Sequence, residues 1–593
     1  MPRRLRKIIT PLLAIFGVQA WLVLLNALWG RNSHVTLLAA AMLVAIVPPV
    51  NRLIWKFLRR LRHPSPKLRA GIAIGVAAVA GFTLAGYAVS SGRDLFPTMH
   101  DESQFLLQAR MLAAGRLWMP GHPLIDFFDT FYVLIQPKYA AQSFPGTALF
   151  FVPSIWLGIA PWKWAVGLAA LAVGLFYRVV AEIVDGLAAL LAAAMLTILS
   201  MLRFVSTMVL AQMPAVLLGL AAIWAYLRWR RSTRHPFAWA ACLGFVCGMM
   251  SVTRPADAVI FALPIGVAVL IDLWKNNRRK AGSLLAIVLA ATPWLGLQLV
   301  VDHGVTGQWL TTPFSLYNQR DQPRLAYGLR MPAANPPPQT RVPEKREYYH
   351  SIQSLLAAHR PENFWHTFTT VRLPTTIGDD LPQPMLIALL PIGLLAWGRR
   401  KTWVLAATLP LFLLIYTFYP LFPAHYTILT APAVILTVAL APRAISLAWP
   451  RARAGAWSAL AVFVVGLLFT RYVDCYQMTS ALAFHATVLA AANEQTAQLA
   501  ARGRPAVVLF RRDPRLPLDY EPVYNLDAAW PDDELVMRAH WRGGDDWRIY
   551  QYYAQHGPDR AFYLFDESRP LAGLTYLGMA SDLARTSEGH PPG

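Results

Sequence analysis

Long apolar segments recur along the chain from the N-terminus to about residue 473, and short polar connections separate them. Most are long enough for a helix to cross the hydrocarbon core of a bilayer. The residues after 473 have mixed polarity, many charges and no run long enough to span. We therefore expect an α-helical polytopic membrane bundle over 1–473 and a soluble domain over 474–593.

The soluble segment shows its own pattern of helices and strands. Apolar periodicity predicts helices over 478–502 and 547–556, and strands over 506–510, 534–538 and 561–565. This mixture indicates a small α/β unit. Its sequence has no Gly-rich phosphate loop and no catalytic signature, so acceptor recognition and capping of the bundle both stay open as roles.

Composition supports the membrane class. The chain is 56% hydrophobic and only 15% charged. Its net charge of +22 could indicate a nucleic-acid partner, but the basic residues are clustered in short connections between apolar segments. Because short Lys/Arg-rich loops stay in the cytoplasm, the charge indicates membrane orientation instead. We expect a lipid bilayer as partner and no nucleic acid.

The basic connections predict the topology of about twelve spans. The basic connections are Arg3–Lys7, Lys56–Arg69, Arg228–Arg234, Lys275–Lys280, Arg399–Lys401 and Arg443–Arg453. The clearest spans between them are 8–30, 35–58, 71–91, 205–227, 237–252, 255–274, 281–301, 384–398, 402–420, 425–441 and 455–473. The first span, 8–30, is expected to be an uncleaved anchor. Three apolar segments lie between residues 145 and 201. Because both ends of this stretch are expected on the outer side, only an even number of full membrane spans fits there. We therefore expect 145–160 to be re-entrant or interfacial.

With this topology, two large loops, 92–147 and 302–383, and the C-terminal domain lie outside. Six polar residues that were not used to fix the topology also reach the outer side: Asp101, Glu102, Lys138, Arg203, Arg254 and His425. Carboxylates at the rim of a membrane bundle are costly and therefore candidates for function. A vectorial enzyme working on the outer leaflet would have this distribution.

The acid pair opens a recognisable motif. Asp101, Glu102, Phe105, Ala109 and Arg110, followed by Gly115, fit the pattern D-E-x-x-aromatic-x-x-x-A-R. This resembles the first external loop of GT-C class glycosyltransferases, in particular the protein O-mannosyltransferases and lipid A aminoarabinose transferases. The resemblance implies that Asp101 is the catalytic base and that Glu102 assists or positions it. The structural alternative is that the pair only caps the helix that follows.

Three further motifs are similar to stretches of the same family. Gln136-Pro137-Lys138-Tyr139 with Pro145-Gly146 resembles the stretch before the next membrane helix, and it implies substrate contacts for Lys138 and Tyr139, although the second Pro of the family pattern is missing at Ala140-Ala141. Thr253-Arg254-Pro255 implies a guanidinium on phosphate oxygens. His425-Tyr426, with Arg203 as a further basic group, completes the expected substrate-binding set. Each could instead be an interfacial side chain without function.

One family feature is absent from the sequence. Some relatives carry a second acid in the stretch comparable to Ser206–Pro214, where this chain has Gln212 and no carboxylate. No His/Asp/Glu cluster has metal-ligand spacing. We expect no cofactor, with a divalent metal left open. The aromatic and amide residues of 302–383 suit sugar contacts or interfacial packing, and a loop of this length is often functional.

The resemblance covers roughly 1–473 and implies an inverting glycosyltransferase of the bacterial inner membrane with its active face and C-terminal domain in the periplasm. It would move a hexosyl or pentosyl group from a polyprenyl-phosphate donor to an envelope acceptor that the sequence does not identify. One alternative is a lipid or solute transporter, although the sequence has no repeated halves with midplane polar residues. A second is an envelope scaffold that has lost activity.

Overall fold

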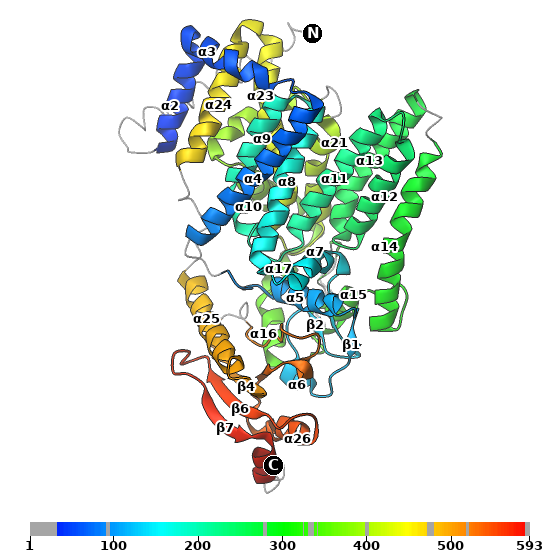
Figure 1. Ribbon diagram of the computed structural model, residues 1–593, viewed down its shortest axis with the longest axis vertical. Coiled ribbons are helices and arrows are strands. Elements are labelled where there is room, and N and C mark those ends of the chain that lie inside the picture. Colours follow the sequence, from blue (N-terminus) through cyan, green and yellow to red (C-terminus); the bar gives the residue numbers. More distant parts are fainter. Residues whose placement is uncertain are drawn as a thin grey trace.

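The structure is a computed structural model that describes residues 33–90, 95–276, 281–323, 325, 327–329, 337–340, 342–397, 402–470, 480–516 and 521–587. The expected span 8–30, the basic groups Arg3–Lys7 and Arg399–Lys401, and part of the group Lys275–Lys280 lie outside these residues. Figure 1 shows a helical bundle at one end of the molecule, loop elements beneath it and the C-terminal domain at the far end.

Six described helices are long and apolar enough to cross a membrane, by length and composition. They are Pro66–Ser90 (α4), Pro161–Ile183 (α8), Pro255–Lys275 within α13 (Pro255–Asn276), Ser283–Thr306 (α14), Ala431–Ala448 (α23), and Pro450–Leu468, mostly α24 (Arg453–Thr470). Shorter apolar helices are Gly186–Ile198 (α9), Pro236–Ser251 (α12), Pro384–Leu394 (η5 and α20) and Thr402–Thr417 (α21 and α22). The chain is a multi-pass membrane protein, and the total of about twelve spans stays a prediction.

The segment expected as a span over 35–58 is bent, and its role as a span stays a prediction. The chain forms α2 (Ser33–Ile46) and α3 (Pro48–Leu58), which meet at an angle of 93°. Pro48 and Pro49 lack the N–H groups that would continue the helix, and a proline ring disfavours helical backbone before it. Counted as one bent span, this pair would be a seventh crossing.

The centre of the bundle is α8, α9, α11 (Gln212–Arg231) and α23, whose buried faces share one apolar core. The peripheral pair α12 and α14 packs backbone against backbone. A Cβ atom at Gly244 would overlap the Ile287 carbonyl, so glycine is needed for this close approach. The short helix α10 (Ser200–Val205) directly follows α9, and the 3-10 helix η6 (Ala424–Leu429) directly precedes α23.

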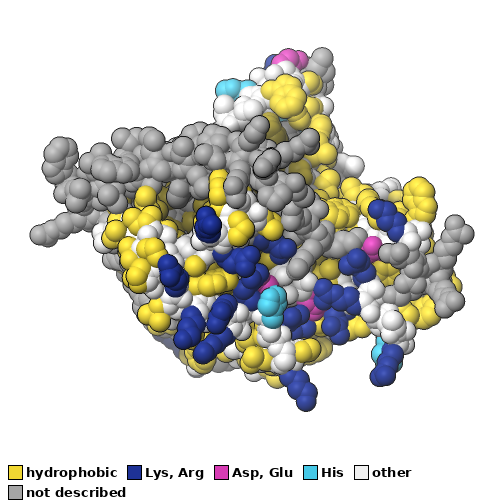
Figure 2. Space-filling view, turned by 90° about the horizontal axis from the view of Figure 1, so that it is seen from above, with side chains coloured by type: hydrophobic (Ala, Val, Ile, Leu, Met, Phe, Trp, Pro, Cys, Tyr) yellow, Lys and Arg dark blue, Asp and Glu magenta, His cyan; other side chains and the backbone are white. Residues whose placement is uncertain are grey.

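Lys and Arg side chains gather on the end of the bundle that lies away from the C-terminal domain (Figures 1 and 2). Several are paired there with buried or half-buried acids: Arg62 with Asp185 (2.8 Å), Arg178 and Arg231 with Glu182 (3.2 and 2.8 Å), and Arg230 with Asp272 (3.0 Å). The short basic connections that the structure describes and the two large loops therefore lie at opposite ends of the molecule.

The first large loop, 92–147, is folded rather than extended. It contains α5 (His100–Ala113), α6 (Ile125–Phe128) and a small antiparallel sheet in the order β1-β3-β2 (Met119–Pro120, Lys138–Ala141 and Val133–Leu134), and α7 (Pro145–Trp156) follows it. With 12 residues, α7 is shorter than the six helices that are long enough to span, and its re-entrant or interfacial placement stays a prediction. The second loop carries α15 (Pro313–Asp321), α16 (Pro343–Ser351), α17 (Gln353–Ala358), α18 (Phe364–Thr367) and α19 (Leu373–Asp379).

The C-terminal segment forms a four-stranded sheet in the order β5-β4-β6-β7, in which only β7 is antiparallel to its neighbour. Its elements are α25 (Ser480–Ala500), β4 (Ala506–Arg511), β5 (Val536–His540), α26 (Trp547–Gln555), β6 (Ala561–Asp566), β7 (Thr575–Met579) and α27 (Ala580–Ser587). The sequence pattern does not predict β7 and α27. Residues of the sheet share a buried apolar cluster with the first loop, including Phe127 and Tyr139 beside Leu509 and Phe562. The two parts are therefore packed together.

Candidate active site

The acid pair at the start of α5 is divided between two tasks. One oxygen of Glu102 accepts the backbone N–H groups of Thr98 (3.0 Å) and Met99 (3.3 Å), and the other accepts the N–H of Val209 (2.9 Å). The Glu102 carboxylate therefore caps α5 and ties its start to the segment before α11. Asp101 accepts a hydrogen bond from the Gln104 amide at 3.2 Å. The alternative that the acid pair only caps the helix therefore accounts for Glu102 but not for Asp101.

Asp101 lies in an enclosed, largely aromatic environment. Burial raises the pKa of its carboxyl above the ordinary value, against the lowering effects of the Arg254 charge and the Gln104 hydrogen bond. Its own charge acts on four tyrosines that come from both loops, the bundle and the C-terminal domain: Tyr132, Tyr419, Tyr426 and Tyr524. The structure thus brings the predicted Asp101, Arg254 and Tyr426 into one site.

Arg254 sits in the break between α12 and α13, where Pro255 begins the second helix. Its Nε is paired with Asp257, and its Nη2 donates to the Tyr416 hydroxyl at 2.7 Å. Tyr416 in turn donates to Asp257 at 2.7 Å, and the guanidinium carbon lies 4.5 Å from the centre of the Tyr426 ring. These contacts fix the guanidinium plane. Asp257 and Tyr416 were not predicted, because each lies within an apolar segment whose pattern indicates only packing.

His425 lies beside this cluster, with its ring edge-on to Tyr426 at a centroid distance of 5.0 Å. Burial, with the neighbouring Arg254 charge, lowers the pKa of the His425 imidazole to about 3. The ring is therefore neutral near pH 7. It has no positive charge to set against a phosphate, and any contact with one would be a neutral hydrogen bond.

The remaining predicted residues lie in other surroundings. Strand alternation places Lys138 and Tyr139 on opposite faces of β3. Tyr139 is buried in the core shared with the C-terminal domain, edge-on to Trp530 at 5.4 Å, and Lys138 has no hydrogen bond or ion pair to another side chain in the described part of the protein. Arg203 packs over the Tyr87 ring at 5.4 Å and donates to the Ile198 carbonyl at 2.6 Å. Their substrate roles stay predictions.

Tyr132 is a site residue that the sequence did not indicate. Its φ angle is +63°, a left-handed conformation that is strained for a bulky side chain. Its ring lies edge-on to His100 and Tyr317, both at 5.9 Å, and its N–H donates to the Tyr317 hydroxyl at 3.0 Å. Such strain is retained where the surroundings force it, and here those surroundings include Asp101. No sequence signal distinguishes Tyr132 from the other tyrosines of the loop.

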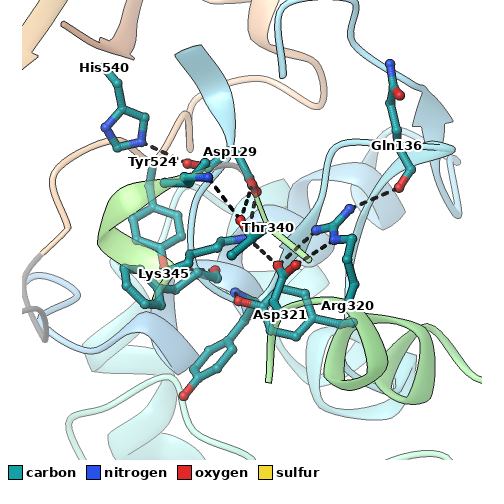
Figure 3. Close-up of polar contacts among 12 residues, drawn as sticks. Asp129, Gln136, Arg320, Asp321, Thr340, Lys345, Tyr524 and His540 are labelled. Carbon is teal, nitrogen blue, oxygen red and sulfur yellow. Dashed lines mark hydrogen bonds and ion pairs between the residues drawn. The ribbon is translucent and has the colours of Figure 1, made fainter. Parts of the chain in front are cut away.

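A buried charge network holds the loops around these tyrosines (Figure 3). The Lys345 ammonium lies 2.6 Å from Asp129 and 2.8 Å from Asp321, and Arg320 pairs with Asp321 at 2.6 Å. Burial alone would raise the pKa of Asp321, but Lys345 and Arg320 hold it below its usual value. His540 contacts the Asp129 carbonyl at 2.8 Å. The network therefore joins the first loop, the second loop and the C-terminal domain.

Solved structures that resemble the chain at low sequence identity were found. No family model matches it, and no curated protein matches it. Among solved structures it is similar to ArnT from Cupriavidus metallidurans bound to undecaprenyl phosphate, at 13% identity and a TM-score of 0.47 over 85% of this chain and 94% of that one.

Two further solved structures are similar to the chain. The S. cerevisiae protein O-mannosyltransferase Pmt1-Pmt2 complex bound to the sugar donor has 15% identity and a TM-score of 0.31, over 46% of this chain and 38% of that one. The mycobacterial arabinofuranosyltransferase AftD has 15% identity and a TM-score of 0.37, over 89% and 37%. Because these likenesses are distant, the proposal below depends on the site itself.

Proposed function

We propose that the protein is an inverting glycosyltransferase that uses a polyprenyl-phosphate sugar as donor and a hydroxyl group as acceptor. The observation that carries this proposal is the placement of Asp101 and Arg254 in one enclosed site, although they come from a loop helix and a distant helix break. A carboxylate beside a fixed guanidinium provides a proton acceptor and a phosphate-binding group together.

Arg254 would bind the phosphate of the donor. As the bond between the sugar C1 and the phosphate oxygen breaks, that oxygen gains negative charge, and a fixed cation stabilises the charge without reorganising. Tyr416, Asp257 and the Tyr426 ring hold the guanidinium in place before the donor arrives. A planar guanidinium also suits two phosphate oxygens at once.

Asp101 would act as the general base. The acceptor oxygen attacks C1 from the side opposite the phosphate, its proton passes to Asp101, and the polyprenyl phosphate leaves with the bonding electrons. A carboxylate with a raised pKa is a stronger base than an ordinary one, which favours this step near neutral pH. Glu102 would fix the helix end from which Asp101 projects.

The location of the site also supports a transferase. Transporters place their polar residues near the bilayer midplane between repeated halves. Here the polar cluster lies beside the two loops, at the end of the bundle away from the Lys/Arg-rich face (Figures 1 and 2). Because that basic face is expected in the cytoplasm, we propose that the site and the C-terminal domain lie on the outer, periplasmic side of a bacterial inner membrane.

The test is a transfer assay with the purified full-length protein in nanodiscs, a set of polyprenyl-phosphate hexoses and pentoses, and an extract of envelope glycolipids and polysaccharides as acceptor. We expect transfer from at least one donor, and loss of that transfer in Asp101→Asn. Arg116→Met, a change at an exposed position on the same side of the molecule, should transfer normally. Transfer at the normal rate by Asp101→Asn would contradict the assignment of the base.

A further inference from the structure

A polar cavity lies between the start of α5 and the C-terminal domain. Its volume is about 280 Å³, close to the lower end of the range of about 300–1,000 Å³ for small-molecule sites. Its walls come from the segment 96–103, from α25 and from the residues around β5. It is therefore built by both parts of the protein and lies next to the helix that carries Asp101.

Several polar groups of this cavity are only partly used by the fold. Glu521 accepts the Val523 N–H with one oxygen (2.9 Å), and Glu534 accepts two backbone N–H groups with one oxygen. Asn493 accepts Arg538 through its carbonyl oxygen at 2.8 Å. In the described part of the chain, no partner is found for the second carboxylate oxygen of Glu521 or Glu534 or for the Asn493 amide nitrogen. These atoms remain available to a ligand.

The charge of the cavity selects a neutral, hydroxyl-rich ligand. Three carboxyl groups, those of Glu521, Asp527 and Glu534, and one guanidinium, that of Arg538, line the cavity. The excess of carboxyl groups disfavours a phosphate, which the Arg254 cluster would take instead. Arg538 lies among these carboxyl groups, and in the described part of the chain no group of three or more His, Cys, Asp or Glu side chains could hold a metal ion. Separated oxygen acceptors, an amide donor and the apolar walls of Leu489 and Val536 suit a saccharide, whose hydroxyls and C–H faces need both.

The ionisation of the two carboxyls supports the same ligand. Burial, together with the nearby Glu344 and Glu567 carboxyls, raises the pKa of Glu521 to about 8, and burial raises the pKa of Glu534 to about 7. Near neutral pH these groups carry a proton for part of the time. They can then both donate to and accept from sugar hydroxyls.

The wall toward Asp101 is formed by His100 and Tyr524. Both residues line the cavity. The Tyr524 hydroxyl lies 3.0 Å from His100 Nδ1 and donates to the Phe131 carbonyl at 3.0 Å. The charge of Asp101 also acts on Tyr524. A ligand in the cavity is therefore held beside the helix turn that presents the base. We propose that this cavity binds the saccharide portion of the acceptor, an inference that rests on the proposed glycosyl transfer.

The test measures binding without turnover. Saturation-transfer NMR would be recorded on the full-length protein in nanodiscs with methyl α-D-mannopyranoside, methyl β-D-galactopyranoside, methyl β-D-glucopyranoside and methyl α-D-arabinofuranoside. We expect at least one glycoside to bind. Glu521→Gln should weaken it by up to about tenfold, the loss expected for one hydrogen bond to a sugar hydroxyl. Val536→Phe, which fills the cavity, should abolish binding.

Glu494→Gln is the matched control, because Glu494 lies exposed on α25 next to Asn493 and outside the cavity. Its binding should equal that of the wild type. Binding should also persist in Asp101→Asn, which loses transfer. The proposal is overturned if no glycoside binds the wild type, or if Glu521→Gln and Val536→Phe both bind as the wild type does. Glu521→Gln retains side-chain shape, so it tests the site even where Val536→Phe fails to fold.

Transfer kinetics separate this inference from the proposed function. If transfer occurs and the acceptor KM is unchanged in Glu521→Gln and Val536→Phe, the acceptor site is wrong and the transferase stands. If glycosides bind in the cavity but no donor sugar is transferred, the proposed function is wrong and the saccharide site stands.

Discussion

Replacing Lys345 by methionine removes the cation at the centre of the buried network. The Lys345 side chain is 2% exposed, and its two partners, Asp129 and Asp321, are 4% and 0% exposed. After the change Asp321 keeps Arg320, whereas among the described residues Asp129 keeps a single side-chain hydrogen bond, from Thr340 at 3.5 Å. Asp129 then has no ion-pair partner among the described residues, and the charge of Arg320 acts on it only from a distance.

The expected cost follows from that geometry. Removing one partner of a buried ion pair destabilises a protein by about 3–5 kcal/mol, because the remaining charge is neither hydrated nor compensated. We expect a loss of this size in the local stability of the segments that the network joins. Asp129→Asn in the same protein should restore part of it, with a coupling of about 0.5–3 kcal/mol, since the uncompensated charge is then gone.

The assay is hydrogen exchange measured by mass spectrometry on the protein in nanodiscs, read at peptides covering 126–134 and 342–351. Local opening free energies are obtained from such protection. Lys67→Met, the same chemical change at an exposed position of α4, should leave these peptides unchanged. The reasoning is refuted if Lys345→Met changes their protection by less than about 0.5 kcal/mol, or if Asp129→Asn adds a further loss.

Two other predictions concern the helix that carries the base. Glu102→Ala leaves three backbone N–H groups without their acceptor. We therefore expect the free energy of unfolding to fall by about 1–3 kcal/mol in thermal unfolding, and kcat to fall while donor binding is kept. An unchanged kcat would contradict the positioning role. The pKa of Asp101 is raised, so the acid limb of kcat/KM should lie above the ordinary range of an aspartate, with activity gained as the pH rises through it. Gln104→Leu removes a hydrogen bond that lowers this pKa, so the limb should move to higher pH, and a shift to lower pH would count against Asp101 as the base.

Much of the architecture follows from local patterns in the sequence. Five elements of the C-terminal segment, α25, β4, β5, α26 and β6, lie within two residues of the predicted ranges, because alternating and helical periodicities are both strong there. The parity of basic connections also places Asp101 and Arg254 at the same end of the bundle. The bend between α2 and α3 had a signal, Pro48-Pro49, that the length of the apolar segment concealed.

The rest depends on contacts between distant segments. Whether Lys138 or Tyr139 faces the site depends on how β3 packs. The hydropathy pattern does not contain that information. Asp257 looks like an isolated acid in an apolar helix until Arg254 and Tyr416 surround it. The neutral state of His425 follows from burial beside Arg254, which no local pattern predicts.

The central claim is that Asp101 and Arg254 divide the chemistry of one site, with Arg254 binding phosphate and Asp101 accepting a proton. The most direct measurement is the binding of polyprenyl phosphate, without a sugar, to the wild type, Arg254→Met, Asp101→Asn and the control Arg116→Met. We predict that Arg254→Met binds at least about tenfold more weakly, the loss of one charged hydrogen-bonding group, and that Asp101→Asn binds as tightly as the wild type or more tightly. Normal binding by Arg254→Met, or loss of binding in Asp101→Asn, would contradict the account.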